Sequence, residues 1–178
     1  MSKLNDFFIT LLFKKKKSNG DIDWEPKEGA LKLQKWLEGQ GYSVFLCDVD
    51  SGGDIFQIVS EAMDNAKMFI VFGSKTYGFK TDSKCSTYQE LSFIFDEKKP
   101  FFLFKMCNKY SVSTTKTLLS RGIAYDEWYP FQNLQLPLAS CENIIKKYTS
   151  LFGAKQVCCL FIFFSCILQT NAALLNAP

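Results

Sequence analysis

Short apolar runs alternate with amphipathic segments through most of the chain, from Asp6 to Lys155. Runs such as residues 7–13 and 68–72 are apolar without polar alternation, which is typical of strands covered on both faces. Segments such as residues 27–40 repeat apolar residues at a spacing of three and four, which is typical of a helix with one buried face. The alternation therefore predicts an α/β fold, with βαβ units around a parallel sheet.

Turn and capping residues set the expected boundaries of these elements. We expect strands at residues 7–13, 42–47, 68–72 and 101–106, and a short edge strand at 123–125. We expect helices at residues 27–40, 86–98, 114–120 and 139–152, and one after the N-cap Asp54 that buries Ile55, Ile58, Val59, Ala62 and Ala66. Residues 1–155 are expected to form one domain, followed by an apolar tail over residues 156–178.

The chain contains no histidine, and this absence excludes several kinds of site. It removes Ser-His-Asp and Cys-His nucleophile pairs, His-ligated zinc and haem held by a proximal His. Any catalysis would come from carboxylates, hydroxyls, thiols or backbone groups. The 21 basic and 18 acidic side chains leave a net charge of +3, too small a surplus to indicate a nucleic-acid partner, and we expect none.

Seven cysteines occur without a C-x-x-C pair, so their spacing fits neither a zinc ribbon nor a disulfide framework. Cys47, Cys85, Cys107 and Cys141 lie in or beside apolar stretches, which indicates buried free thiols in a reducing compartment. The first six residues lack the charged start and apolar run of a secretory signal. We therefore expect a cytoplasmic protein without a metal site or a bound cofactor.

Three motifs taken together resemble the TIR (Toll/interleukin-1 receptor) domain family. The first is Asp6-Phe-Phe-Ile-Thr10, which is similar to the family's opening strand of the form D-x-F-I-S. The second is Gly41-Tyr-Ser-Val-Phe-Leu-Cys-Asp48 followed by Ser51-Gly-Gly-Asp-Ile55, which resembles the second strand and the loop after it. The third is Ser86-Thr-Tyr-Gln-Glu-Leu91, which matches the family's third-helix pattern and follows a strand that ends in Gly73-Ser74. The resemblance covers roughly residues 6–153.

This resemblance implies a five-stranded parallel sheet with flanking helices, the flavodoxin-like TIR fold. It also implies signalling in innate immunity or cell death through homotypic assembly with other TIR domains, self-association included. Some members of the family hydrolyse NAD+ at the bond between nicotinamide and ribose, and the Glu of the third-helix pattern is their catalytic residue. That position is Glu90 here, which makes the chain a candidate NAD+ nucleosidase with NAD+ as its substrate.

Cleavage of an N-glycosidic bond is compatible with a single carboxylate at Glu90. The reaction passes through an oxocarbenium-like state that a carboxylate can stabilise or trap, and no histidine is required. Helical spacing predicts that Glu90 lies beside Leu91 but away from the apolar stripe of Leu91, Ile94 and Phe95. It could then border a cleft at the carboxyl ends of the strands. The competing interpretation is a solvated carboxylate on the helix surface.

The loop after the second strand is the expected binding loop. Under the resemblance it contacts either the nucleotide or a neighbouring domain. Together with two residues after the third strand it forms the candidate binding set, which is Asp48, Asp50, Ser51, Gly52, Gly53, Ser74 and Tyr77. The glycine pair has two other interpretations, a tight turn or a phosphate cradle, although the chain has no G-x-G-x-x-G or Walker pattern.

Three departures from the family pattern keep other functions open, the first of which is a shortened loop after the second strand. The apolar run of the first strand continues through Leu11, Leu12 and Phe13, where the family usually has polar residues near the substrate. Ser86 and Thr87 stand where the family has Trp-Cys before the catalytic Glu. The alternatives are a catalytically inactive TIR adaptor or scaffold and, on fold analogy, a flavodoxin-like nucleotide-binding module.

Two segments raise the question of membrane contact, which is the less favoured interpretation for both. Lys14–Lys17 is a run of four lysines that is either solvated or attracted to anionic lipid or nucleotide phosphates. Residues 157–168 carry no charge but are too short for a membrane span, which needs about 20 apolar residues. The tail over residues 156–178 is interpreted as a packed element, a membrane anchor or the product of an incorrectly joined coding sequence.

Overall fold

The computed structural model describes residues 4–12, 26–46, 55–80, 86–120, 122–129 and 135–155. The lysine run, the expected binding loop at residues 48–53 and the tail over residues 156–178 lie outside the described residues. The chain divides into two compact units, Met1–Ile145 and Lys146–Pro178. The sheet and the candidate site both belong to the first unit.

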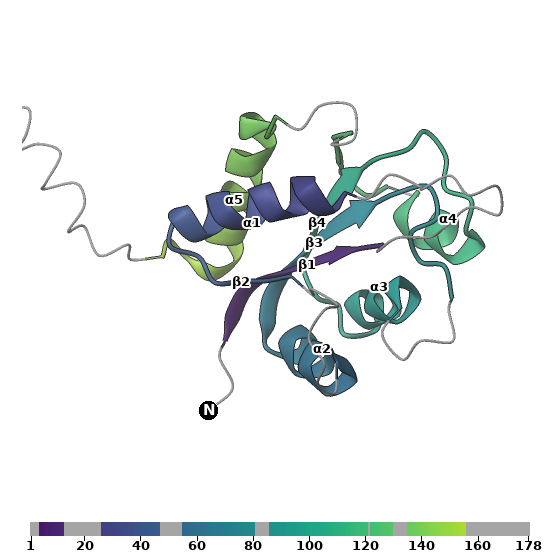
Figure 1. The fold of residues 1–178 in the computed structure, drawn as a ribbon, viewed down its shortest axis with the longest axis horizontal. Helices are drawn as coiled ribbons and strands as arrows, with labels where there is room; N and C mark the ends of the chain where they lie inside the picture. Colours follow the sequence, from purple (N-terminus) through teal and green to yellow (C-terminus); the bar gives the residue numbers. More distant parts are fainter. Residues whose placement is uncertain are drawn as a thin grey trace, which may run out of the picture. The chain divides into compact units, whose positions relative to one another are not determined.

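A five-stranded sheet forms the centre of the first unit, and all of its strands are parallel (Figure 1). Its strands are β1 (Asn5–Leu11), β2 (Val44–Leu46), β3 (Ala66–Gly73), β4 (Phe101–Lys105) and β5 (Asp126–Glu127). They lie side by side in the order β2-β1-β3-β4-β5. The α/β fold class expected from the sequence is confirmed, with strand ends shifted by at most three residues.

The helices of the structure are α1 (Lys27–Gly39), α2 (Ile55–Asp64), α3 (Thr87–Asp96), α4 (Ser113–Leu119) and α5 (Leu138–Phe152). Within the first unit, α1 covers one face of the sheet, whereas α2 and α3 cover the other face (Figure 1). Covering both faces explains why the central strands are apolar without alternation. Among the described residues, no helix is long and apolar enough to cross a membrane.

The edge strand differs from its expected position. The sequence predicts a strand at residues 123–125, but the pairing partners of Phe104 and Lys105 on β4 are Asp126 and Glu127. Tyr125 instead projects outward with 45% of its side chain exposed, and its ring lies 4.4 Å from the Lys105 ammonium. The ring of Tyr125, which had indicated a strand, forms a cation–π contact with Lys105 instead.

The buried stripe of α2 is also different from the expected one. Val59 and Ala62 are buried as expected, but Ile58 is 48% exposed and Ala66 belongs to β3. Met63 is buried instead of Ile58 and Ala66. It lies four residues after Val59, which places it one turn further along the same face of the helix. The buried face of α2 is therefore rotated about the helix axis relative to the expected one, and the side chain of Ile58 faces solvent.

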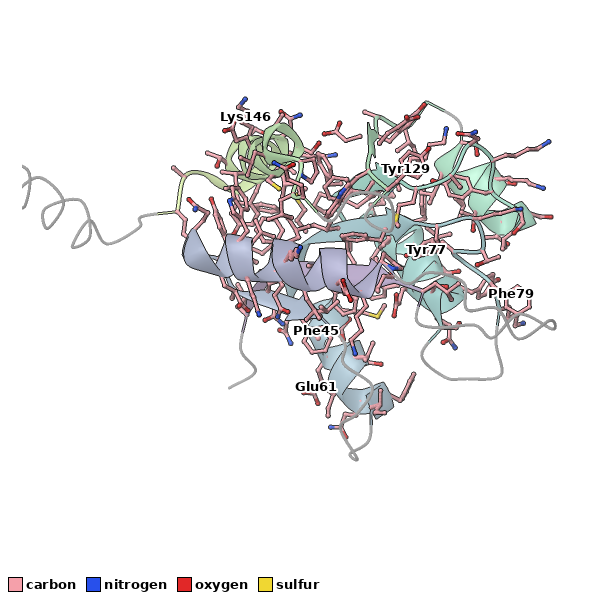
Figure 2. The ribbon with its side chains drawn as sticks, turned by 45° about the horizontal axis from the view of Figure 1, so that its top comes forward. Phe45, Glu61, Tyr77, Phe79, Tyr129 and Lys146 are labelled. Atoms are coloured by element: carbon pink, nitrogen blue, oxygen red, sulfur yellow. The ribbon has the colours of Figure 1, made fainter. Side chains whose placement is uncertain are left out.

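Alternate residues of the central strands supply the two faces of the core. Phe8, Phe69 and Val71 belong to the hydrophobic cluster that contains the buried residues of α2 and α3. On this side the ring of Phe45 from β2 stacks on Phe8 at 5.2 Å between centroids (Figure 2). The period of two along β1 places Thr10 on the same face as Phe8. A polar side chain near the end of β1 thus points toward α2 and α3.

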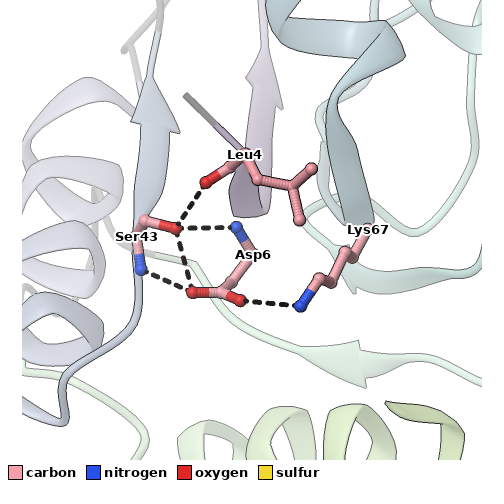
Figure 3. Close-up of polar contacts among 4 residues, drawn as sticks. All are labelled: Leu4, Asp6, Ser43 and Lys67. Atoms are coloured by element: carbon pink, nitrogen blue, oxygen red, sulfur yellow. Dashed lines mark hydrogen bonds and ion pairs between the residues drawn. The ribbon is translucent and has the colours of Figure 1, made fainter. Parts of the chain in front are cut away.

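The buried carboxylate of Asp6 connects the start of β1 to β2 (Figure 3). Its Oδ2 accepts a hydrogen bond from the backbone N–H of Ser43 at 2.8 Å, and the Ser43 hydroxyl accepts one from the backbone N–H of Asp6 at 2.9 Å. Its Oδ1 lies 3.5 Å from Nζ of Lys67 on β3. The first residue of the opening motif therefore joins three neighbouring strands.

Replacing Asp6 with alanine is expected to lower the free energy of unfolding by about 2 kcal/mol, because the Ser43 N–H loses its acceptor in a partly buried place. Lys67→Ala should cost less than about 1 kcal/mol, since this side chain is 37% exposed and surface ion pairs contribute little. Urea unfolding of both variants measures the difference. Equal losses would show that the ion pair, and not the hydrogen bonds, anchors the strand.

Candidate active site

The candidate site lies where the order of strands reverses. From β1 the chain crosses through α1 to β2 on one side, and β3 lies on the other side of β1. Open α/β sheets bind ligands at the carboxyl ends of the strands at this switch point. Thr10 is the second-last residue of β1 and Ser74 directly follows β3, so both lie at this edge of the sheet.

A capping box begins α3 and sets the position of Glu90. The Ser86 hydroxyl accepts a hydrogen bond from the backbone N–H of Gln89, and the Gln89 side chain accepts one from the backbone N–H of Ser86 at 3.0 Å. Glu90 thus lies in the first turn, where the partial positive charge of the helix N-terminus favours a carboxylate.

Glu90 lies on the buried side of α3, which corrects the helical-stripe prediction. The buried residues of this helix are Thr87, Glu90, Leu91 and Ile94, whereas Phe95 is half-buried. Only 8% of Glu90 is exposed. The interpretation of Glu90 as a solvated surface carboxylate is therefore wrong.

Glu90 is held from inside the fold by a hydroxyl pair. The Thr10 hydroxyl donates a hydrogen bond to Oε2 of Glu90. The hydroxyl of Tyr77, which follows β3, lies 2.7 Å from Oγ1 of Thr10. Thr10 and Tyr77 are both buried, so Glu90 ends a hydrogen-bonded chain that joins β1, the turn after β3 and α3.

The turn after β3 is fixed by hydrogen bonds to two neighbouring helices. Thr115 on α4 donates to the carbonyl of Tyr77 at 2.5 Å, and the N–H of Gly78 donates to the Thr87 hydroxyl on α3 at 3.0 Å. Tyr77 consequently lies within the fold, while Phe79, two residues later, is 40% exposed and projects from its edge (Figure 2). These bonds fix the backbone of the turn, so that the Tyr77 hydroxyl lies beside that of Thr10.

Burial changes the pKa of both titratable groups in this hydrogen-bonded chain, Glu90 and Tyr77. Burial raises the pKa of Glu90 to about 7, although the hydrogen bond from Thr10 opposes the change. Burial, and then the charge of Glu90, raise the pKa of Tyr77 well above its usual value. Glu90 can therefore exchange a proton near neutral pH, while the Tyr77 hydroxyl stays protonated.

A cavity of about 200 Å³ opens between α2 and α3, and Glu90 forms part of its wall. Its other lining residues are Phe56, Val59, Ser60 and Met63 from α2 and Ser86, Gln89 and Phe93 from the start and body of α3. None of these side chains is basic, so within the described part of the chain no cation faces Glu90 across the cavity. The site combines one buried carboxylate with a mostly apolar wall.

The structure describes only two of the seven residues in the candidate binding set. Asp48, Asp50, Ser51, Gly52 and Gly53 lie outside the described residues. Of the remaining two, Tyr77 contacts Glu90 through Thr10 and is completely buried. Ser74 is half-buried, and its hydroxyl has no hydrogen-bond partner among the described residues.

Sequence reasoning did not assign a role to Thr10. A signal was present, because Thr10 is a polar residue within an otherwise apolar strand and lies in the opening motif. A polar side chain in such a strand must find a hydrogen-bond partner once buried.

The thiols and carboxylates of the described residues form no site that could hold a metal ion. Both Cys141 and Cys107 are free thiols, as expected, but only Cys141 is buried, whereas Cys107 is half-buried. Cys47 and Cys85 lie outside the described residues. Among the described residues, Glu90 is the ionisable group in the wall of the cavity, with Thr10 and Tyr77 as its hydroxyl chain.

No protein-family model matches the sequence, and no curated protein matches it. Among solved structures, the chain is similar to the TIR domain of the Toll-related receptor TRR-2 from Hydra magnipapillata, with a TM-score of 0.51 and 15% sequence identity. The similarity covers 81% of this chain and 98% of that domain. At this level of identity the comparison shows the fold, which is that of a TIR domain.

Proposed function

We propose that the protein is a TIR-type signalling protein that works by homotypic TIR–TIR assembly and hydrolyses NAD+ at Glu90. The observation that supports the hydrolase is the place of Glu90, which lies on the wall of a cavity between α2 and α3 and is hydrogen-bonded to Thr10 near the carboxyl end of β1. The cytoplasm is the proposed location, because Cys107 and Cys141 are free thiols.

The charge of the cavity favours a cationic ligand. Glu90 is buried, and its described hydrogen-bond partner is the neutral hydroxyl of Thr10. An ionised carboxylate in such a place gains from a positive charge brought by a ligand. The nicotinamide ring of NAD+ carries this charge, and departure of nicotinamide moves it to the ribose as an oxocarbenium ion. Glu90 could stabilise that ion or trap it as an ester.

The volume of the cavity also limits what it can hold. Ligand sites usually enclose about 300 to 1,000 Å³, whereas this cavity measures about 200 Å³. It would take the nicotinamide end of NAD+, with the rest of the dinucleotide outside it. Phe56 and Phe93 would provide apolar contacts for a planar ring.

The second candidate function is that of an assembly module without catalysis. It is favoured by the exposed apolar side chains of Phe56 and Ile58, which are 44% and 48% exposed on α2. Apolar groups on one helix are suited to burial against another domain. Under this alternative, the protein is a TIR adaptor or scaffold.

NAD+ consumption by the full chain tests the proposed hydrolase. Nicotinamide release should be measured at protein concentrations high enough to drive assembly, with oligomerisation followed in the same sample by light scattering. Glu90→Gln should lower the rate at least about 100-fold, because it removes the charge that stabilises the transition state. Glu61→Gln, which changes an exposed carboxylate on α2, should leave the rate within about twofold of the original.

Three outcomes separate the candidate functions. Hydrolysis that depends on Glu90 supports a signalling enzyme. Unchanged NAD+ in an assembled sample supports the adaptor and rejects hydrolysis. A protein that stays monomeric and recruits no TIR domain contradicts assembly, the common premise of both.

A further inference from the structure

We propose that Tyr77 is a positioning residue for Glu90, because its buried hydroxyl fixes the direction of the hydrogen bond from Thr10 to the carboxylate. Its relevance to catalysis rests on the proposed NAD+ hydrolysis, but the hydrogen-bonded chain itself can be tested without a substrate. Tyr77 was expected in a binding loop and lies instead in the core, one hydroxyl away from Glu90.

The direction of this chain follows from counting protons. Thr10 carries a single hydroxyl proton, which it donates to Oε2 of Glu90. The contact of 2.7 Å between Thr10 and Tyr77 then requires Tyr77 to be the donor. The chain therefore runs from Tyr77 through Thr10 to Glu90, and each bond polarises the next.

The reverse direction is unfavourable in this structure. If neutral Glu90 donated to Thr10, Thr10 would donate to Tyr77, and the Tyr77 proton would need another acceptor. Tyr77 is completely buried, and among the described residues its hydroxyl forms a hydrogen bond only with Thr10. A buried hydroxyl proton without an acceptor is costly. A neutral Glu90 protonated on Oε1 would still accept from Thr10 at Oε2, but less strongly than the carboxylate does. The pair of hydroxyls therefore favours the ionised form of Glu90 over the neutral form.

No charged group competes with this effect in the part of the chain that the structure describes. The groups that face Glu90 are Thr10 from β1, Tyr77 from the turn after β3, and Ser60 from α2. From α3 itself, Ser86 and Gln89 line the same cavity. All five are neutral, so the hydroxyl chain and the N-terminal turn of α3 are the local influences that oppose the effect of burial on Glu90.

The test is a pH titration of Glu90 by NMR in the full chain, with glutamate labelled by ¹³C at the carboxyl carbon and Glu90→Gln used to assign the signal. Thr10→Val should lower the ratio of ionised to neutral Glu90 about tenfold at a given pH, because it removes the donor. Tyr77→Phe keeps the ring but removes the hydroxyl, and should lower the ratio about threefold.

Two control variants separate this effect from a change in packing. Thr10→Ser retains the hydroxyl and should stay close to the original titration. Tyr110→Phe also removes a buried tyrosine hydroxyl, but this hydroxyl has no partner among the described residues, so the Glu90 titration should not move. Thermal unfolding of each variant confirms that it folds.

An unchanged Glu90 titration in folded Tyr77→Phe would overturn the proposal, as would an equal change in Tyr110→Phe. The unmodified protein supplies a second measurement that does not depend on folding of a variant. There the Tyr77 hydroxyl proton should exchange slowly with solvent and show a nuclear Overhauser contact to Thr10, and fast exchange would contradict the hydrogen-bonded chain.

The failure of this proposal is distinguishable from failure of the hydrolase. A titration that changes as expected in a protein that leaves NAD+ intact supports the positioning role and rejects the reaction. Hydrolysis with an unaffected titration supports the reaction and rejects the positioning role. If both hold, Tyr77→Phe should shift the pH dependence of nicotinamide release in the same direction as the titration.

Discussion

Raising the pH through neutrality is expected to destabilise the protein by about 3 kcal/mol relative to its Glu90→Gln variant. The cause is burial, which raises the pKa of Glu90 from 4.5 to about 7 in the folded protein. Between these values the folded state keeps a proton that the unfolded state has released, so stability falls as the pH rises. The free energy of unfolding is highest below the pKa that Glu90 has in the unfolded chain. The whole loss of stability is present above the pKa that Glu90 has in the folded protein.

Urea unfolding of both proteins between about pH 4 and pH 8 measures this difference. Their stabilities should be similar at the acid end, because glutamine resembles the neutral carboxyl, and should diverge as Glu90 ionises. Glu61→Gln on the exposed surface of α2 is the matched control and should follow the unmodified protein (Figure 2). Parallel curves for the original and Glu90→Gln would mean that Glu90 is solvated in the folded protein.

Such a penalty is typical of a residue kept for function. A glutamine at position 90, which keeps an acceptor for Thr10, would stabilise the fold at neutral pH, so the fold itself gains little from this carboxylate. The hydrogen bond from Thr10 offsets only part of the cost of burial. The combination of a buried anion with an adjacent cavity therefore supports a binding or catalytic role.

The sheet could be predicted from the sequence because its central strands are strongly apolar. The runs that include Phe8 and Phe69 had to be covered on both faces, and the apolar stripe of Leu33 and Leu37 had to be a helix. These patterns are local and depend on the side chains within one element. The position of the edge strand was predicted less accurately, because this strand consists of only Asp126 and Glu127 and is defined by its pairing to β4.

The candidate site was predicted only in part, since its contacts join residues far apart in the chain. Glu90 was identified by resemblance, but a carboxylate on a helix is usually exposed, and nothing local indicated its burial. Thr10 lies 80 residues from Glu90 and 67 from Tyr77, so their hydrogen bonds arise from the order of the strands. Tyr77 was assigned to the candidate binding set, and its burial depends on contacts with α3 and α4.

Gly78→Ala is expected to lower the free energy of unfolding by about 3 kcal/mol or more. Gly78 has a φ of +78°, and an alanine in this left-handed region costs about 1 to 2 kcal/mol. Its Cβ would also overlap Oγ1 of Thr115 and lie 3.3 Å from Cδ2 of Leu91. Overpacking of a buried site adds about 1 to 3 kcal/mol.

Gly122→Ala separates the two causes of this loss. Gly122 has a similar φ of +69°, but a Cβ there would meet no atom within 4 Å, so only the backbone cost of about 1 to 2 kcal/mol remains. Because Thr115 donates to the carbonyl of Tyr77, displacing it in Gly78→Ala should also loosen Tyr77 beneath Thr10. Urea unfolding and the Glu90 titration measure both effects. Equal losses of stability in the two variants would show that the space around Gly78 is not filled by Thr115, and would remove this turn as a support of the site.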